Sequence, residues 1–126
     1  MTSLNIMVVD DSAITIKKLT KILEELGHTV VAVARTGRDA AAMYGSVNPD
    51  LVTMDITMPD MDGIEATKLI RKEFHDALII MVTSHGQEQM VIDAIEAGAL
   101  GYVIKPVKKE KLQESIDRIL DKFWKS

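Results

Sequence analysis

The stretch LVTMDITMPDMDG at residues 51–63 contains a short apolar run, a single acid at the end of that run, and then several turn-forming residues. Pro49 and Asp50 precede the run and Pro59 follows it, so residues that interrupt regular structure bound it on both sides. Short apolar runs with such boundaries are typical of buried strands. Asp55 is therefore predicted to lie at the carboxyl end of a buried strand.

Strand-like and helix-like segments alternate along the whole chain. The predicted strands are residues 5–9, 30–34, 51–54, 78–82 and 102–104. Five alternations with short connections predict an α/β domain, a (βα)5 doubly wound parallel five-stranded sheet with helices on both faces. The strands are apolar almost throughout, which favours burial on both sides of the sheet.

Each strand is followed by apolar residues at helical spacing. The residues expected to face inward are Ile16, Leu19, Ile22, Leu23 and Leu26 in the first helix, Ala40, Met43, Tyr44 and Val47 in the second, Ile64, Thr67, Ile70 and Phe74 in the third, Met90, Val91, Ala94 and Ile95 in the fourth, and Leu112, Ile116, Ile119, Leu120 and Phe123 in the fifth. The predicted helix boundaries are Gly27 and Gly98 as C-terminal caps, Thr36 with Asp39 as a capping box, and Asp62 with Glu65 as an N-terminal cap.

Length and composition limit the kinds of protein that this chain can be. Its 126 residues suit a single domain, residues 1–126, and no apolar run approaches the ~20 residues that a bilayer requires. The first residues do not resemble a signal peptide and the chain has no cysteine, so we predict a cytoplasmic protein without disulfides or thiolate metal sites. A net charge of -4 argues against nucleic acid as a direct partner. We expect neither membrane nor nucleic-acid binding.

Polar residues stand where the predicted strands end. They are Asp10 and Asp11 after the first strand, Asp55 after the third, Thr83 after the fourth and Lys105 after the fifth. Because all carboxyl ends of a parallel sheet lie on one edge, these side chains are expected to meet there. Two carboxylates about 4 Å apart repel by ~4 kcal/mol at an effective dielectric of 20, so the cluster favours a bound cation. Oxygen ligands without cysteine favour Mg²⁺, which shares its coordination with phosphate.

A phosphoryl group would suit the same cluster. Lys105 and Thr83 are suited to hold phosphoryl oxygens, and a carboxylate can be the nucleophile that forms an acyl phosphate. Asp55 is the candidate acceptor because it ends the central strand, with the other site residues on either side.

These residues together resemble the receiver domain of two-component response regulators of the CheY type. The marks of the resemblance, which covers residues 5–123, are the Asp10-Asp11 pair, Asp55 within its MDITMPDMDG context, Thr83-Ser84, Tyr102 and Lys105-Pro106. The resemblance implies a flavodoxin-like strand order of 2-1-3-4-5. It also implies that Asp55 accepts phosphate from a sensor histidine kinase or a small acyl phosphate.

The resemblance implies further roles as well. Asp11 and Asp55 would bind Mg²⁺ directly, Asp10 mainly through water, and the Thr57 backbone carbonyl would supply another oxygen. Thr83 would bind the phosphoryl group and Tyr102 would swing inward, changing the surface formed by the fourth helix, fifth strand and fifth helix, where an output protein binds a monomeric receiver. The Lys105-Pro106 bond would be cis. Thr57 and His85 would tune the lifetime of the phosphoryl group.

Other interpretations of the sequence remain open. A stand-alone chemotaxis regulator is the first hypothesis, and a receiver excised from a longer transcriptional regulator or methylesterase is the alternative. An aspartate-nucleophile phosphohydrolase is disfavoured because Thr57 stands where that class has a second acid. An interaction module without phosphorylation is disfavoured by the intact site.

Single residues also have simpler explanations. Asp10-Asp11-Ser12 alone would more often cap a helix, and Tyr102 alone would more often pack in a core. His28 and His75 are expected to be solvated in turns. Trp124 either covers the end of the last helix or contacts a partner.

Overall fold

The computed structural model describes residues 2–123, which form one five-stranded parallel sheet covered by helices on both faces. The elements are β1 (Asn5–Val9), α1 (Ala13–Glu25), β2 (Thr29–Ala34), α2 (Gly37–Val47), β3 (Leu51–Met54), α3 (Gly63–Glu73), β4 (Ile79–Thr83), α4 (Glu88–Ala97), β5 (Gly101–Ile104) and α5 (Lys109–Phe123). Adjacent strands pair in parallel in the order β2-β1-β3-β4-β5. The predicted fold class and strand order are confirmed. Trp124 lies outside the described residues.

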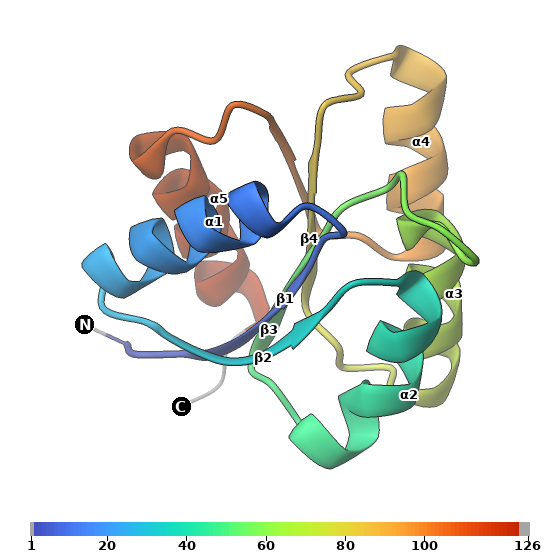
Figure 1. Cartoon of the computed structure of the whole chain (residues 1–126), viewed down its shortest axis with the longest axis horizontal. Coiled ribbons are helices and arrows are strands. Elements are labelled where there is room, and N and C mark those ends of the chain that lie inside the picture. The colour runs from blue at the N-terminus through green and yellow to red at the C-terminus, as the bar shows by residue number, and fades with distance from the viewer. Residues whose placement is uncertain (1, 124–126) are drawn as a thin grey trace.

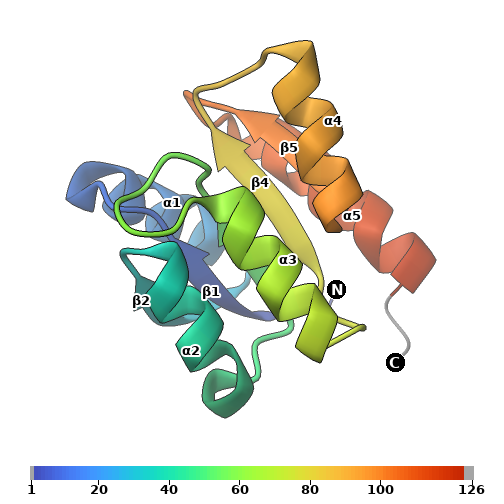
Figure 2. The ribbon, with the colours of Figure 1, turned by 90° about the vertical axis from the view of Figure 1, so that its right-hand side faces the viewer.

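Two apolar cores hold the layers together, one on each face of the sheet. Figure 1 shows α1 and α5 on one side of the sheet, and Figure 2 shows α2, α3 and α4 on the other. Alternate residues of a strand point to opposite faces, so Met7 and Val9 enter the core under α2–α4 whereas Ile6 and Val8 enter the core under α1 and α5. The inner strands β1, β3 and β4 are therefore buried on both faces, as the sequence predicts, whereas the edge strands leave Val31, Val33 and Ile104 exposed.

Three of the predicted caps are confirmed, but the C-terminal cap of α1 is Leu26 rather than Gly27, which follows it in the left-handed region at φ 93°. The Thr36 side chain accepts a hydrogen bond from the Asp39 N–H at the start of α2, and the Asp62 side chain accepts one from the Glu65 N–H at the start of α3. Gly98 caps α4 in the left-handed region at φ 115°. These caps fix where the loops at the carboxyl edge of the sheet rejoin the helices.

None of the helices within residues 2–123 is long and apolar enough to cross a membrane.

Two residues predicted to face inward do not. Ile95 is 58% exposed and Phe123 is 48% exposed. Helix α4 buries Ala94 and Ala97 and carries apolar residues on most of its other faces, so spacing alone could not identify its inner side. Phe123 continues the inner stripe of α5 but lines an open hollow with Leu78.

His28 is buried, which contradicts the prediction that it is solvated. Only 9% of it is exposed, and its Nδ1 accepts a hydrogen bond of 3.1 Å from the Leu4 N–H. The turn after α1 therefore lies beneath the start of β1 rather than in solvent. Burial lowers the pKa of His28, an effect that the charge of Asp117 partly opposes.

This burial predicts a pH-dependent stability. The pKa of His28 is lower in the folded than in the unfolded state. The contribution of neutral His28 to the free energy of unfolding is therefore complete above the unfolded pKa of ~6.5 and is lost as the pH falls through the folded pKa. We expect the free energy of unfolding, measured by urea titration, to fall below pH ~6.5. His28→Asn, which can keep an acceptor for Leu4, would flatten this fall, whereas His75→Asn, at an exposed site, would leave it unchanged. An unaltered fall in the His28 variant would assign the effect to other groups.

Candidate metal centre

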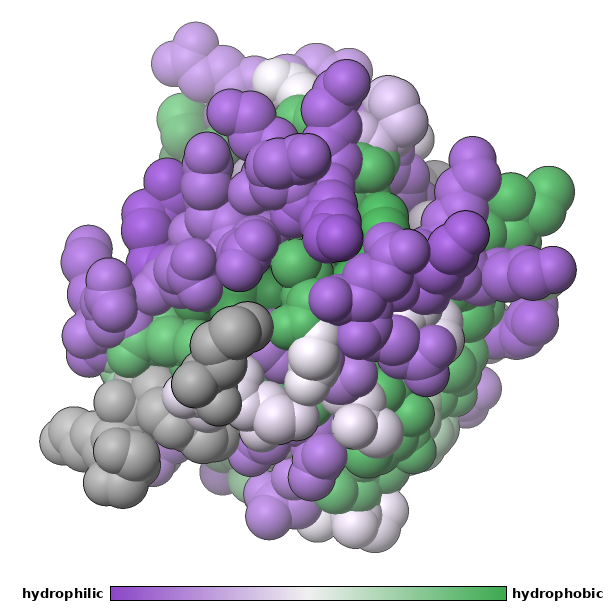
Figure 3. All heavy atoms as spheres, turned by 90° about the vertical axis from the view of Figure 1, so that its left-hand side faces the viewer, coloured by the Kyte–Doolittle hydropathy of each residue, from purple (hydrophilic) through white to green (hydrophobic). Residues whose placement is uncertain are grey.

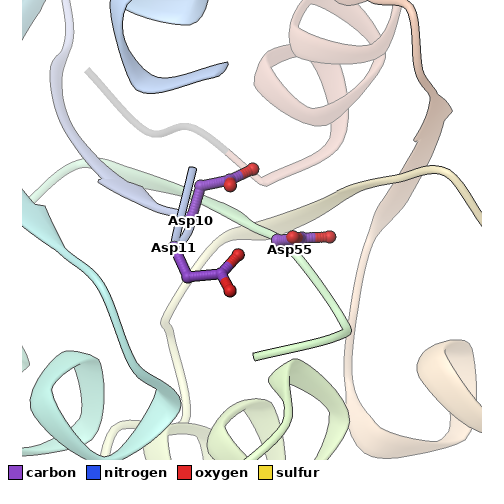
Figure 4. Close-up of side chains that lie close together, drawn as sticks. All are labelled: Asp10, Asp11 and Asp55. Carbon is purple, nitrogen blue, oxygen red and sulfur yellow. The ribbon is translucent and has the colours of Figure 1, made fainter. Parts of the chain in front are cut away.

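Three carboxylates gather where β1 and β3 end. Val9 pairs with Met54 across the two strands, so the residues that follow them, Asp10 and Asp55, come to lie side by side. Asp10, Asp11 and Asp55 each place an oxygen within 4.8 Å of the others (Figure 4). Asp10 and Asp55 are 1% and 6% exposed, and Asp11 is exposed. The predicted convergence of the acids is confirmed.

Main-chain hydrogen bonds hold these acids in position. The Asp55 N–H donates to the Val9 carbonyl at 2.9 Å, which extends the β1–β3 pairing by one residue. One oxygen of Asp10 accepts the Ser12 N–H at 2.9 Å, and one oxygen of Asp55 accepts the Ile56 N–H at 2.8 Å. Each buried carboxylate therefore has one oxygen bonded to the main chain, and its other oxygen faces the Lys105 amine.

A lysine that follows the edge strand β5 completes the cluster. Lys105, which follows β5, places its Nζ 2.8 Å from an oxygen of Asp10 and 3.4 Å from an oxygen of Asp55. The predicted approach of the Lys105 amine to the acids is thus confirmed. The Lys105-Pro106 peptide bond is cis, as predicted.

Burial and charge shift the titration of this cluster. Burial, together with the charge of Asp10, raises the pKa of Asp55, against the opposing effects of Lys105 and the Ile56 N–H. Burial alone would lower the pKa of Lys105, but its hydrogen bond to Asp10 and the charge of Asp55 raise it. The site therefore carries more negative charge than one lysine relieves.

The remaining predicted site residues are joined through His85. The Thr83 hydroxyl, fully buried at the end of β4, accepts the His85 N–H at 3.2 Å. The His85 ring Nε2 lies 2.8 Å from the Thr57 hydroxyl, and the Tyr102 hydroxyl donates to the His85 carbonyl. Sequence reasoning singled out all four residues but did not predict that His85 contacts the other three. No spacing rule indicates such contacts, because they depend on how the loops after β3 and β4 fold.

The sequence also did not reveal that Gly63 packs closely beneath Asp55, the candidate acceptor. Gly63 donates its N–H to the Ile56 carbonyl at 2.8 Å, and a Cβ on Gly63 would lie closer than 3.0 Å to the Asp55 carbonyl oxygen. In the sequence, the Asp62-Gly63 pair indicates only a turn. Its further role is to let the start of α3 approach the backbone of Asp55.

The donor set fits Mg²⁺. Asp10, Asp11 and Asp55 offer oxygen ligands only, two of them from buried carboxylates whose mutual repulsion a divalent cation would relieve. Mg²⁺ is a hard cation that takes one or two carboxylates and keeps waters, so a partly open cluster of this kind suits it. Asp11, the exposed member, lies on the side of the cluster that solvent reaches.

Comparisons with known proteins agree with this geometry. A family model described as the response regulator receiver domain matches residues 6–117. Chemotaxis protein CheY of Bacillus subtilis is 46% identical over 116 residues, which cover 92% of this chain and 97% of that protein. Chemotaxis protein CheY of Thermotoga maritima is 40% identical over 114 residues, which cover 90% and 95%.

A solved structure shows the same fold. The crystal structure of the CheX-CheY-BeF3-Mg complex from Borrelia burgdorferi contains a chain that matches with a TM-score of 0.88 and 36% identity over 92% of this chain and 88% of that one. The likeness therefore extends over nearly the whole chain.

Proposed function

The chain belongs to the response regulator receiver domain family, the CheY-like receivers of two-component systems, and we propose that Asp55 is its phosphoryl acceptor in a chemotaxis-type switch. The observation that supports this most is the meeting of Asp10, Asp11 and Asp55 with Lys105 at one edge of the sheet. Asp55 is the central member, because it follows the middle strand β3, whereas Asp10 follows β1 on one side and Lys105 follows β5 on the other.

The reaction that these residues suit is phosphoryl transfer. An oxygen of Asp55 attacks the phosphorus, the bond from phosphorus to the donor nitrogen of a phosphohistidine breaks, and an acyl phosphate forms. When bound by Asp10, Asp11, Asp55 and the Thr57 carbonyl, Mg²⁺ supplies charge neutralisation for the phosphoryl oxygens. Lys105 adds a second cation next to Asp55, and the Thr83 hydroxyl donates a hydrogen bond to the phosphoryl group. A small acyl phosphate such as acetyl phosphate can replace the kinase.

The output of the switch lies away from the acceptor. A phosphoryl group that recruits Thr83 also affects His85, whose N–H the Thr83 hydroxyl accepts and whose carbonyl holds Tyr102. The phosphoryl group would then stabilise the position in which Tyr102 packs on the core and donates to the His85 carbonyl, and so change the α4–β5–α5 surface, where an output protein binds. In this proposal the protein is a cytoplasmic monomer that catalyses only its own phosphorylation and dephosphorylation. The Mg²⁺ in the Borrelia CheY complex supports the same metal here.

Beryllofluoride, a stable phosphoryl mimic, provides the test. Amide hydrogen exchange of the protein with Mg²⁺ alone is compared with exchange in Mg²⁺ and beryllofluoride, and each form is then used to capture partners. We expect slowed exchange at Asp55 and Thr83, altered exchange over α4 and β5, and a partner enriched only by the loaded form. Identical exchange in both conditions would contradict the proposal.

The contact between Thr57 and His85 predicts a change in phosphoryl lifetime. Their 2.8 Å hydrogen bond ties the loop that follows β3, which carries the acceptor, to the loop that follows β4. Thr57→Val removes the bond without changing the shape of the side chain, and we expect the phosphoryl group to hydrolyse several-fold faster because water enters more freely. Thr57→Ser, which keeps the hydroxyl, serves as the control. Loss of the acyl phosphate is followed after removal of the donor, and equal lifetimes in the Val and Ser variants would contradict the prediction.

A further inference from the structure

Gly37, the first residue of α2, touches the loop that follows the acceptor. Its N–H donates to the Met61 carbonyl at 3.2 Å. A Cβ at this position would lie closer than 3.0 Å to the Met61 oxygen and 3.0 Å from the Asp62 oxygen. Both neighbours are backbone atoms, which cannot rotate aside as a flexible side chain can. Close approach, rather than a left-handed conformation, therefore requires glycine here.

The loop reaches Asp55 from this contact within a few residues. Asp62 caps α3, and the next residue, Gly63, donates its N–H to the Ile56 carbonyl. Gly63 also packs against the Asp55 carbonyl so closely that a Cβ would overlap it. The segment from Ile56 to Asp62 is thus held by Gly63 beneath Asp55 and by Gly37 at the start of α2. A displacement of Met61 would therefore displace Gly63 and, through it, the backbone of the acceptor.

Helix α2 is the firmer side of this contact. Its residues Ala40 and Tyr44 are 0% and 6% exposed in the core, and Thr36 caps its start. In the loop, by contrast, Ile56 and Met58 are buried, Met61 is only partly buried, and Thr57, Pro59 and Asp60 are exposed. A side chain added at Gly37 would consequently displace the loop before it displaced the helix.

We propose that Gly37 is a positioning residue for the phosphorylation reaction. Because Gly37 allows Met61 to lie against the start of α2, it determines the position of the Thr57 carbonyl in the loop relative to Asp10 and Asp11. This inference rests on the proposed function, because it concerns the same Mg²⁺ ligands. Mg²⁺ requires near-ideal octahedral geometry with short ligand distances, so a small displacement of one oxygen weakens its binding. Helix α2 contributes no ligand and acts through the loop alone.

Gly37→Ala tests the proposal through the Mg²⁺ dependence of labelling by acetyl phosphate. Loss of outer supporting contacts commonly costs 10- to 100-fold in metal affinity, and we expect the Mg²⁺ concentration for half-maximal labelling to rise about tenfold. The labelling rate at saturating Mg²⁺ would change less than about threefold, because Asp55 and Lys105 are unaltered. A variant with the wild-type Mg²⁺ dependence would overturn the proposal.

Two control variants separate positioning from loss of stability. Gly45→Ala lies on the same helix, but there a Cβ would meet only the end of the Phe74 ring, so we expect normal Mg²⁺ dependence. Ile119→Val removes a methylene from the core beneath α5, on the opposite face of the sheet. It would lower the melting temperature and leave the Mg²⁺ dependence unchanged. A rise in the Mg²⁺ requirement of Ile119→Val equal to that of Gly37→Ala would overturn the proposal.

A measurement on the unaltered protein covers the case in which Gly37→Ala does not fold. Coupling between two sites is reciprocal, so Mg²⁺ alone would slow hydrogen exchange of the Gly37 amide, whose proton is bonded to Met61. The Gly45 amide, within α2, would change little. Equal effects of Mg²⁺ on both amides would overturn the inference. If the proposed function itself were wrong, acetyl phosphate would not label the wild-type protein at any Mg²⁺ concentration.

Discussion

Asparagine in place of Asp55 is expected to abolish labelling by acetyl phosphate and, in Mg²⁺-free buffer, to make the protein more stable. The amide cannot act as the nucleophile, so labelling falls to background. The same substitution keeps an oxygen that can accept the Ile56 N–H, which lies 2.8 Å from the Asp55 side chain. It removes a carboxylate whose charged form is disfavoured by burial and by Asp10. Loss of function and gain of stability therefore have one cause.

The sign of the stability change follows from the raised pKa of Asp55. An acid with a higher pKa in the folded than in the unfolded state opposes folding when it is ionised, and this opposition disappears as the pH falls through its folded pKa. We expect Asp55→Asn to raise the free energy of unfolding at pH 7 by roughly 0.5–2 kcal/mol, in the range of stabilising substitutions, and the gain to shrink towards low pH.

Labelling and urea unfolding at several pH values measure the two effects. Asp60→Asn, at an exposed acid in the same loop, serves as the control and would retain labelling. Labelling of Asp55→Asn at the wild-type level would place the acceptor elsewhere. A lower stability of this variant at pH 7 would mean that attraction to Lys105, 3.4 Å from Asp55, outweighs burial and repulsion.

Much of the fold and the membership of the acidic cluster could be predicted because both depend on local patterns. Apolar runs ended by Asp10 and Asp55 locate strand ends, and a parallel sheet brings strand ends to one edge whatever the details of packing. The capping residues Thr36 and Asp62 likewise act within one turn of their helices. These features follow from chain geometry over a few residues.

The features that sequence reasoning missed depend on contacts between distant segments. His28 has the neighbours of a turn residue in the sequence, and its contact with Leu4, which lies far from it along the chain, cannot be recognised there. The contacts of His85 with Thr57 and Tyr102 join loops that no periodicity describes. Ile95 is exposed because α4 packs through the small residues Ala94 and Ala97, which the wide apolar arc of its sequence does not reveal.

Figure 3 shows the face formed by α1 and α5, where hydrophobic atoms appear in a seam between hydrophilic side chains. Partly buried Ile16, Ile22, Val107 and Leu120 pack on the core beneath this face. The predicted inner stripes of α1 and α5 are confirmed there, apart from Phe123 at the end of α5, because charged residues mark the outer sides of both helices clearly. Periodicity thus succeeds where a helix has one apolar face and fails where, as in α4, it has several.

Methionine in place of Lys105 is expected to strengthen Mg²⁺ binding and to slow phosphorylation. The Lys105 Nζ lies 2.8 Å from Asp10 and 3.4 Å from Asp55, so it competes with a metal cation for the same carboxylates. Two unit charges about 4 Å apart interact by ~4 kcal/mol at an effective dielectric of 20, and hydration of the vacated space offsets part of this. We therefore expect Mg²⁺ affinity to rise up to about tenfold, which corresponds to ~1.4 kcal/mol.

The rate of phosphorylation would change in the opposite direction. Lys105 stands beside Asp55, where it can neutralise charge on the phosphoryl group as it transfers, and removing one such preorganised group typically costs about 10²–10³-fold in rate. Titration calorimetry with Mg²⁺ and labelling by acetyl phosphate at saturating Mg²⁺ measure the two effects separately. Lys105→Arg keeps the charge and would recover part of the rate.

Lys109→Met tests whether loss of any nearby lysine has the same effect. Lys109 is about half exposed, with its Nζ 4.0 Å from Glu25 of α1, so its removal would alter neither quantity. Weaker Mg²⁺ binding by Lys105→Met would show that the lysine acts chiefly by holding Asp10 and Asp55 in place for the metal. Tighter Mg²⁺ binding with an unchanged rate would show that the lysine balances charge before the reaction and contributes nothing to the transfer itself.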